Sequence, residues 1–201
     1  MNILRKNKRI SASIIAAVIA LTPVAMLAEG HNDHGDGYRE ADVVIRSMEQ
    51  HQITLPQIIK TAEKAGEGIA IGVEVEDDSA IQTIEVTLLR DNEVLCVNLS
   101  PLTGDVVKIG SPEIIHSAVA RLTNRYDSLK DNKVSLQEAV SIAEKAEQGT
   151  AYHAHIEDMD DWDGYEISIV SNGTHLRVIV DPETGRIVSR ETRNNRHHKD
   201  H

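Results

Sequence analysis

The chain contains an internal repeat, and this repeat constrains its fold more than any other feature. The segment SPLTGDVVKI at 100–109 returns as DPETGRIVSR at 181–190, so the offset in numbering is 181 − 100 = 81. The same offset carries AEKA at 62–65 onto 143–146 without a gap. About 16 of the 56 positions in 53–108 are identical to those in 134–189, so both copies are expected to form the same folding unit.

Each copy is predicted to begin with an amphipathic helix. Thr54 with Gln57, and Ser135 with Glu138, have the spacing of a capping box. Apolar residues follow at helical spacing in both copies. They are Leu55, Ile58, Ile59, Ala62 and Ala65, and then Leu136, Ala139, Val140, Ala143 and Ala146.

The opposite face and the ends of these helices are also predicted from residue type. Glu63, Lys64, Glu144 and Lys145 are expected to face away from the core. Gly66, Gly68 and Gly149 are expected to end the helices by adopting a left-handed conformation.

After each helix the apolar period changes to two, which predicts antiparallel strands. The first strands run through Val73 and Val75, and through Ala154 and Ile156. In DPETG, Asp181 starts a turn and Gly185 takes a positive φ, so this segment joins the third and fourth strands. The remaining predicted strands are 82–89, 93–99, 105–109, 164–171, 174–180 and 186–190.

The predicted fold class is therefore α+β. It consists of two tandem repeats, each with one α-helix packed on a small antiparallel sheet of three to four strands, joined by a linking helix. The predicted segments are a signal peptide at 1–28, a flexible His/Asp-rich segment with a short helix at 29–52, repeats at 53–109 and 134–191, a linking helix at 110–133 and a His-rich tail at 192–201.

The first residues are typical of a secretory signal. Four basic residues at 5–9 precede the apolar run 13–27 and then small residues, which predicts cleavage after Ala28 or after Gly30,. An uncleaved membrane anchor is the alternative, because 10–28 approaches the length of a spanning helix. With cleavage, a periplasmic or secreted location and no membrane attachment are expected.

The charge of the chain limits its partners. The net charge is −11, and the signal segment contributes +4, so the exported part carries −11 − 4 = −15. Such a surface repels phosphate backbones and anionic lipid, which argues against nucleic-acid and membrane-surface roles. Cys96 is the only cysteine, so there is no internal disulfide, and it is interpreted as a structural strand residue,.

The second copy resembles the PepSY domain. The resemblance rests on SLQEAVSIAEKA at 135–146, DGYEISI at 163–169 and VIVDPETGRIVS at 178–189. The first copy departs from the pattern at Pro56, Ile58, Ile84 and Ser100. The resemblance implies an exported bacterial protein whose domains inhibit or regulate peptidases or act as binding modules, and it carries no catalytic residues.

Histidine and carboxylate groups are candidates for a divalent metal, because imidazole with carboxylate suits zinc, copper or nickel. The run EDMDDWDG at 157–164 does not fit a calcium loop, because Met159 and Val170 would occupy positions that need oxygen ligands,. The candidate ligands are His31, Asp33, His34 and Asp36 near the beginning, His153 and His155 on one strand face that Glu157 shares, and His197, His198 and His201 at the end,.

No signature of a catalytic triad or of a metallohydrolase is present, so an enzyme is not expected. The predicted function is a non-catalytic exported protein that binds or regulates a protein or peptide partner in the cell envelope, a protease or a sensor. No cofactor is expected apart from a metal. The alternative is a periplasmic metal-binding or metal-sensing protein that uses its His/Asp-rich tails.

Overall fold

The computed structural model describes residues 36–76, 82–91, 93–112, 129–158 and 163–193. Three helices and eight strands have defined bounds within these ranges. In chain order they are α1 (Asp36–His51), α2 (Leu55–Gly66), β1 (Ile69–Glu76), β2 (Thr83–Arg90), β3 (Glu93–Leu99), β4 (Val106–Gly110), α5 (Leu136–Glu147), β5 (Thr150–Asp158), β6 (Asp163–Ser171), β7 (Thr174–Val180) and β8 (Ile187–Thr192).

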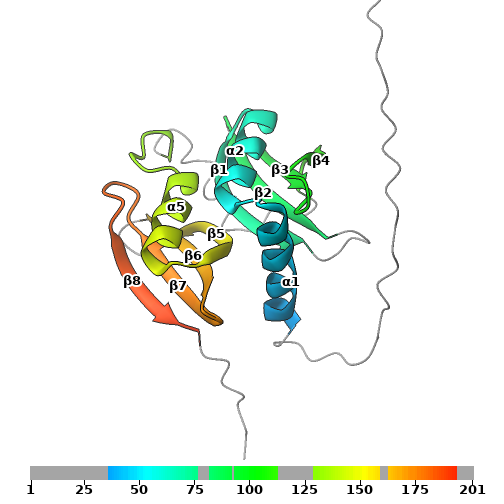
Figure 1. Cartoon of the computed structure of the whole chain (residues 1–201). Coiled ribbons are helices and arrows are strands. Elements are labelled where there is room, and N and C mark those ends of the chain that lie inside the picture. The colour runs from blue at the N-terminus through cyan, green and yellow to red at the C-terminus, as the bar shows by residue number, and fades with distance from the viewer. Residues whose placement is uncertain (1–35, 77–81, 92, 113–128, 159–162, 194–201) are drawn as a thin grey trace, which may run out of the picture. The chain divides into compact units, whose positions relative to one another are not determined.

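The strands form one antiparallel sheet in the order β4-β3-β2-β1-β5-β6-β7-β8 (Figure 1). The α+β class is therefore confirmed, but the expectation of two separate small sheets is wrong. The two meanders join where β1 pairs with β5, through Gly72 with His155 and Val73 with Ala154. Because 73 + 81 = 154, Val73 pairs with its own counterpart, so the offset seen in the sequence also describes this junction.

Both predicted capping boxes are present. Thr54 Oγ1 accepts a hydrogen bond from the Gln57 N–H, and Ser135 Oγ accepts one from the Glu138 N–H. Helix α2 packs on β1–β4 and α5 packs on β5–β7, in addition to contacts with β1 and between the two helices. A single apolar cluster includes residues from both halves, among them Leu55, Val86, Leu136 and Ile167. Burial of this shared cluster is the main favourable term for the fold.

The helix ends differ from the prediction. The left-handed residues are Glu67, with φ 54°, and Gln148, with φ 51°, rather than the glycines. Gly149 instead meets a steric demand, because a Cβ there would lie 2.5 Å from the carbonyl oxygen of Val170. The glycine is therefore required by the close approach of the α5–β5 connection to β6, and not by a special φ,.

Two residues in each of α2 and α5 have a different environment from the one predicted. Ala65 and Ala146 are exposed rather than in the core, whereas Glu63 and Glu144 are partly buried. Glu63 Oε1 accepts from the Ala70 N–H and Glu144 Oε1 accepts from the Ala151 N–H, both at 3.0 Å. These carboxylates tie each helix to the first strand of its half of the sheet, and burial raises the pKa of both,.

The turns between the third and fourth strands form as predicted. Gly185 has φ 68°, and its N–H donates to the Asp181 carbonyl at 2.9 Å. The Asp181 carboxylate accepts from the N–H groups of Glu183 and Thr184. Gly104 occupies the equivalent place with φ 71°, so the offset of 81 also holds for this backbone conformation.

Helix α1 confirms the predicted short helix before the first repeat. Val44, Ile45 and Met48 of this helix are buried. Most of the predicted linking helix at 110–133 lies outside the described residues, and residues 129–130 within it are helical. The signal peptide at 1–28 also lies outside them, and so does all of the 192–201 tail except the last residue of β8 and Arg193. Among the described residues, no helix is both long enough and apolar enough to cross a membrane.

Candidate functional site

Histidine and glutamate side chains lie close together on one face of the sheet in the second half, the face opposite α5. On β5, Ala154 and Ile156 belong to the apolar cluster, and His153, His155 and Glu157 alternate with them. A strand places alternate side chains on opposite faces, so these three polar residues share the outer face. The sequence prediction that they do so agrees with this burial pattern.

Strand β6 adds two polar residues to this face. His155 pairs directly with Glu166, and His153 pairs directly with Ser168. The Glu166 and Ser168 side chains are buried, at 4% and 1% exposed. We call His153, His155, Glu157, Glu166 and Ser168 the outer-face cluster.

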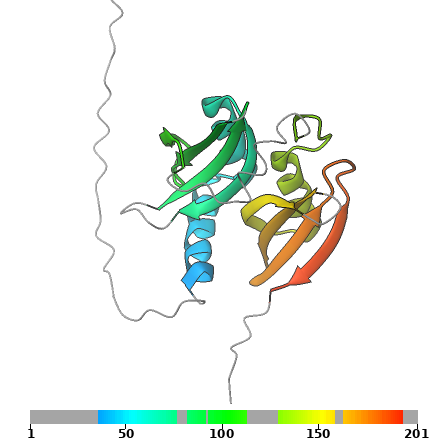
Figure 2. The ribbon, with the colours of Figure 1, turned by 180° about the vertical axis from the view of Figure 1, so that it is seen from behind.

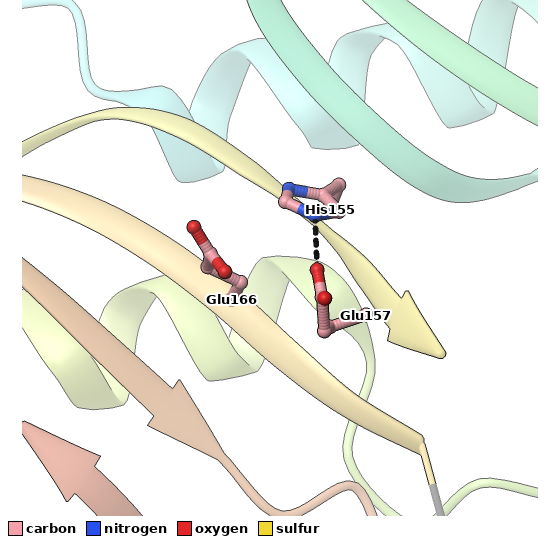
Figure 3. Close-up of side chains that lie close together, drawn as sticks. All are labelled: His155, Glu157 and Glu166. Atoms are coloured by element: carbon pink, nitrogen blue, oxygen red, sulfur yellow. Dashed lines mark hydrogen bonds and ion pairs between the residues drawn. The ribbon is translucent and has the colours of Figure 1, made fainter. Parts of the chain in front are cut away.

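Three members of the outer-face cluster lie close enough to share a ligand (Figure 3). One donor atom each from His155, Glu157 and Glu166 lies within 4.8 Å of the others. The His155 Nε2 atom lies 2.8 Å from Glu157 Oε2, and the rings of His153 and His155 have centroids 5.0 Å apart. The sequence prediction named both histidines as ligands and placed Glu157 on their strand face without naming it as a ligand, and it did not include Glu166.

Two arginines hold Glu166. Arg177 donates to Glu166 Oε2 from Nε at 2.6 Å, and its Nη2 forms an ion pair with the same oxygen. Arg193 Nη2 donates to Glu166 Oε1 at 2.8 Å. Because these groups come from β6, β7 and the residue after β8, the carboxylate links three successive segments of the second half.

The pKa values of two groups in this region are shifted by their surroundings. Burial alone would raise the pKa of Glu166, but the hydrogen bond and charge of Arg177, together with His155 and Arg193, hold that pKa below its usual value,. Burial lowers the pKa of His153 to about 4, and the neighbouring His155 adds to this effect. His153 is therefore neutral at pH 7, and Glu166 is ionised.

Two buried polar atoms of the cluster have no hydrogen-bond partner. They are His155 Nδ1 and Ser168 Oγ. Buried polar atoms in native proteins are nearly always paired, and those without a protein partner commonly contact water or an ion.

A separate polar contact attaches α1 to the second half. The Tyr152 hydroxyl lies 3.2 Å from His175 Nδ1, and His175 Nε2 lies 3.9 Å from Asp42 of α1. Ala41 and Ile45 of α1 pack with Tyr152 in a small apolar cluster. This contact gives His175 and Tyr152 a structural role.

The remaining sequence candidates do not contribute to the described site. His31, Asp33, His34, His197, His198 and His201 lie outside the described residues, as does the side chain of Asp36 at the beginning of α1. Strands β5 and β6 pair as far as Asp158 with Asp163, as expected of a hairpin, and residues 159–162 of the acidic run lie outside the described residues.

Cys96 lies buried in β3, as the sequence indicated. Burial raises the pKa of the Cys96 thiol to about 12, and both the hydrogen bond of the thiol to Glu85 and the charge of Glu85 add to this effect. A thiol with that pKa stays protonated and is a poor nucleophile.

The two edge strands of the sheet differ in character. On β4, Val107 is 60% and Ile109 is 47% exposed, and Leu102 in the preceding turn is 52% exposed. Strand β8 exposes one large apolar residue, Val188 at 49%, and adds charged groups: Arg190 donates to Glu147 at 2.8 Å, and Glu191 lies 3.8 Å from Arg177. Figure 2 shows both strands from behind, each beside only one neighbouring strand.

Comparison with protein families gives one match. Residues 133–191 match the PepSY family, described as the peptidase propeptide and YPEB domain. The match covers the second half, from just before the N-cap of α5 to β8. The resemblance inferred from the sequence is thus confirmed for this segment, and no curated protein matches the chain.

Two solved structures are similar to this chain. A candidate lipoprotein of Clostridium difficile 630 is 21% identical, with a TM-score of 0.40, and the alignment covers 65% of this chain and 86% of that one. The C-terminal domain of Bacillus megaterium YpeB is 11% identical, with a TM-score of 0.29, and the alignment covers 77% of this chain and 66% of that one. At these scores neither neighbour carries a functional argument.

Proposed function

We propose that this PepSY-domain chain is an exported, non-catalytic protein that binds an extended segment of a protein partner, a peptidase, along the outer edge of β4. The family match supports a link to peptidases, because its description names peptidase propeptides. The basic and apolar order of the segment 1–28 supports export,. The high pKa of the Cys96 thiol supports a non-catalytic role, because it removes the one cysteine as a nucleophile,.

The exposed apolar edge of β4 is the observation that carries the proposal. An edge strand presents unpaired backbone N–H and C=O groups, which an added strand can bind while its side chains contact those of the edge. Soluble proteins usually protect such edges with charges. Strand β8 has this protection in Arg190 and Glu191, whereas β4 exposes Val106, Val107 and Ile109 with a single charge at Lys108.

The charge of the exported part selects among partners. A net charge of −15 favours encounter with a basic surface and raises the association rate at low ionic strength,. The proposed partner segment is therefore extended and apolar, and it is flanked by lysine or arginine. Raising the salt concentration is expected to slow association more than it speeds dissociation.

Two matched substitutions test the edge. Ile109→Lys places a charge on β4, and Val188→Lys places the same charge on β8 at a residue of similar exposure, 49% against 47%. Both side chains are exposed, so each change is expected to alter the free energy of unfolding by less than about 0.5 kcal/mol. The Tm of each variant checks this.

The assay captures proteins from a cell-envelope extract on the immobilised chain and quantifies them by mass spectrometry. The proposal predicts that the unsubstituted chain and V188K enrich a peptidase about tenfold over I109K, and that the purified peptidase reproduces this order of affinity. The proposed binding edge would be contradicted if I109K captured the peptidase as well as the unsubstituted chain does. It would also be contradicted if V188K lost as much capture as I109K.

A further inference from the structure

The outer-face cluster brings one imidazole and two carboxylates together by strand geometry. His155 and Glu157 are two residues apart on β5 and so share a face, and Glu166 is the direct cross-strand partner of His155,. Their donor atoms lie within 4.8 Å of one another. Donors bound to one zinc ion at about 2.0–2.2 Å lie roughly 3–4 Å apart, so small side-chain rotations bring all three to a common ion.

Two buried polar atoms around these residues have no hydrogen-bond partner. When His155 Nε2 donates to Glu157, the lone pair of the ring lies on Nδ1, and that buried atom has no partner. Ser168, which is 1% exposed, lies two residues from Glu166 on the same face, and its hydroxyl is also unpaired. A bound water or ion is one way in which two such atoms in one small region are satisfied.

The arginines around Glu166 leave room for an ion and orient the carboxylate. Glu166 Oε2 accepts from Arg177 twice, whereas Oε1 accepts only from Arg193 and keeps one lone pair,. Ligating carboxylates commonly accept such hydrogen bonds, which fix their orientation. The charged groups around the site sum to −3 + 2 = −1, with the negative charges on Glu157, Glu166 and Glu191 and the positive charges on Arg177 and Arg193. The site therefore attracts a cation, but less strongly than an all-acidic site does.

We propose that His155, Glu157 and Glu166 bind a divalent transition-metal ion of the zinc class. An imidazole nitrogen with carboxylate oxygens suits zinc and its neighbours, whereas calcium and magnesium prefer oxygen ligands alone. Three protein ligands leave a fourth position for water or for a donor from a partner. The site is independent of the edge of β4, so either proposal can fail alone.

The first half provides a matched control. The offset of 81 relates the three ligands to Glu74, Glu76 and Glu85, which include no imidazole. Among the described residues, the geometry of a metal site is found only in the second half. Glu76→Gln therefore removes the same charge as Glu157→Gln, from the same strand position, without touching the proposed ligands.

The experiment is a calorimetric titration of the exported chain with zinc chloride. Because the tails also contain histidine, His31, His34, His197, His198 and His201 are first replaced by asparagine. This chain is expected to bind one zinc ion. E157Q and H155N are each expected to weaken binding at least about tenfold, since even residues that only support a metal ligand cost that much when lost, and E76Q is expected to change it less than twofold.

A second readout separates ligation from a general charge effect. Zinc is expected to shift the imidazole resonances of His155 in a histidine side-chain NMR spectrum and to raise the Tm of the chain, because an ion that binds only the folded state stabilises it. No saturable binding by the tail-substituted chain would overturn the proposal. Equal weakening by E76Q and E157Q would overturn it as well, because the binding would then follow net charge rather than these three ligands.

Discussion

The half built from α2 and β1–β4 and the half built from α5 and β5–β8 have the same backbone features but different outer faces. Left-handed residues occur at Glu67 and Gln148, and again at Asp91 and Asn172, and the offset of 81 relates the members of each pair. Register shifts follow Ala70 and Ala151 at the same offset. A few local signals are thus enough to maintain the backbone while the side chains diverge.

The divergence is concentrated on the sheet face opposite α2 and α5. Gly72, Glu85 and Cys96 of the first half correspond to His153, Glu166 and Arg177 of the second. The first half has a neutral thiol where the second has a guanidinium, and its Glu85 is only partly buried. The second half therefore carries an ionic network around one buried carboxylate, Glu166, on an otherwise equivalent sheet. Substitutions in both halves test what that network contributes.

Arg177→Ala is expected to have the largest effect on stability. It leaves Glu166, which is 4% exposed, with Arg193 as its remaining basic partner. Removing one partner of a buried ion pair costs about 3 kcal/mol, because the other charge loses its compensation. The matched change Cys96→Ala in the first half is expected to cost about 1 kcal/mol. Urea unfolding followed by circular dichroism measures both, and equal losses would show that the network adds nothing.

Gly149→Ala is expected to be the next most damaging change. The added Cβ would lie 2.5 Å from the Val170 oxygen and 2.6 Å from Ile169 Cγ2, and the backbone oxygen cannot rotate away. At the equivalent Gly68 the shortest contact is 2.9 Å, to the Leu89 oxygen. The cost is expected to be about 2 kcal/mol at Gly149 and about 1 kcal/mol at Gly68. If G68A lowers the Tm more than G149A does, the connection after α2 has less freedom to move away from β2 than the connection after α5 has to move away from β6.

The helices, strands and turns could be predicted from the sequence because each depends on neighbouring residues. The capping boxes at Thr54 and Ser135 and the turn at Asp181 are local hydrogen-bond patterns, and all three are present in the structure. The glycine assignment failed for a tertiary reason. Gly149 is required by the approach of β6, which helix-capping rules do not describe,.

The junction of β1 and β5 and the partners of Glu166 depend on long-range pairing. Nothing in the alternation of β1 indicates that its free edge meets β5. The side of β6 that carries Glu166 and Ser168 was predictable in principle, because Asn172 and Gly173, with φ 51° and 74°, fix the register of the β6–β7 hairpin,. Arg193 follows the last strand, and its contact with Glu166 depends on the completed sheet.

The neutral His153 makes the second half more sensitive to mild acid than the first, which has Gly72 at this position. Its folded pKa of about 4 lies below the usual 6.5. Between these values the unfolded chain binds a proton that the folded chain does not, so stability falls as the pH decreases from about 6.5 to about 4. His153→Gln is expected to remove about 1 kcal/mol of this loss, a value reduced for the partial exposure of the ring. Unfolding free energies at pH 7, 5.5 and 4.5 measure it, and parallel curves for the two chains would contradict the assignment.

The smallest expected effect comes from exchanging the third-position residues of the two capping boxes. Glu138 accepts from the N–H and Oγ of Ser135, both at 2.9 Å, and these bonds lower the pKa of the Glu138 carboxyl. Gln57 makes the equivalent backbone bond at 2.9 Å without a charge. A carboxylate near a helix N-terminus contributes about 0.5 kcal/mol, so Q57E should stabilise the chain and E138Q should destabilise it by similar amounts.

The pH dependence identifies the charge as the cause of this difference. A carboxyl whose folded pKa is lowered stabilises the chain above its unfolded pKa, and the contribution disappears as the pH falls through the folded pKa. The gain of Q57E over the unsubstituted chain should therefore be present at pH 7 and absent at about pH 3. A gain that persists at pH 3 would come from helix propensity instead, and the two halves would then differ in packing rather than in the electrostatics of their caps.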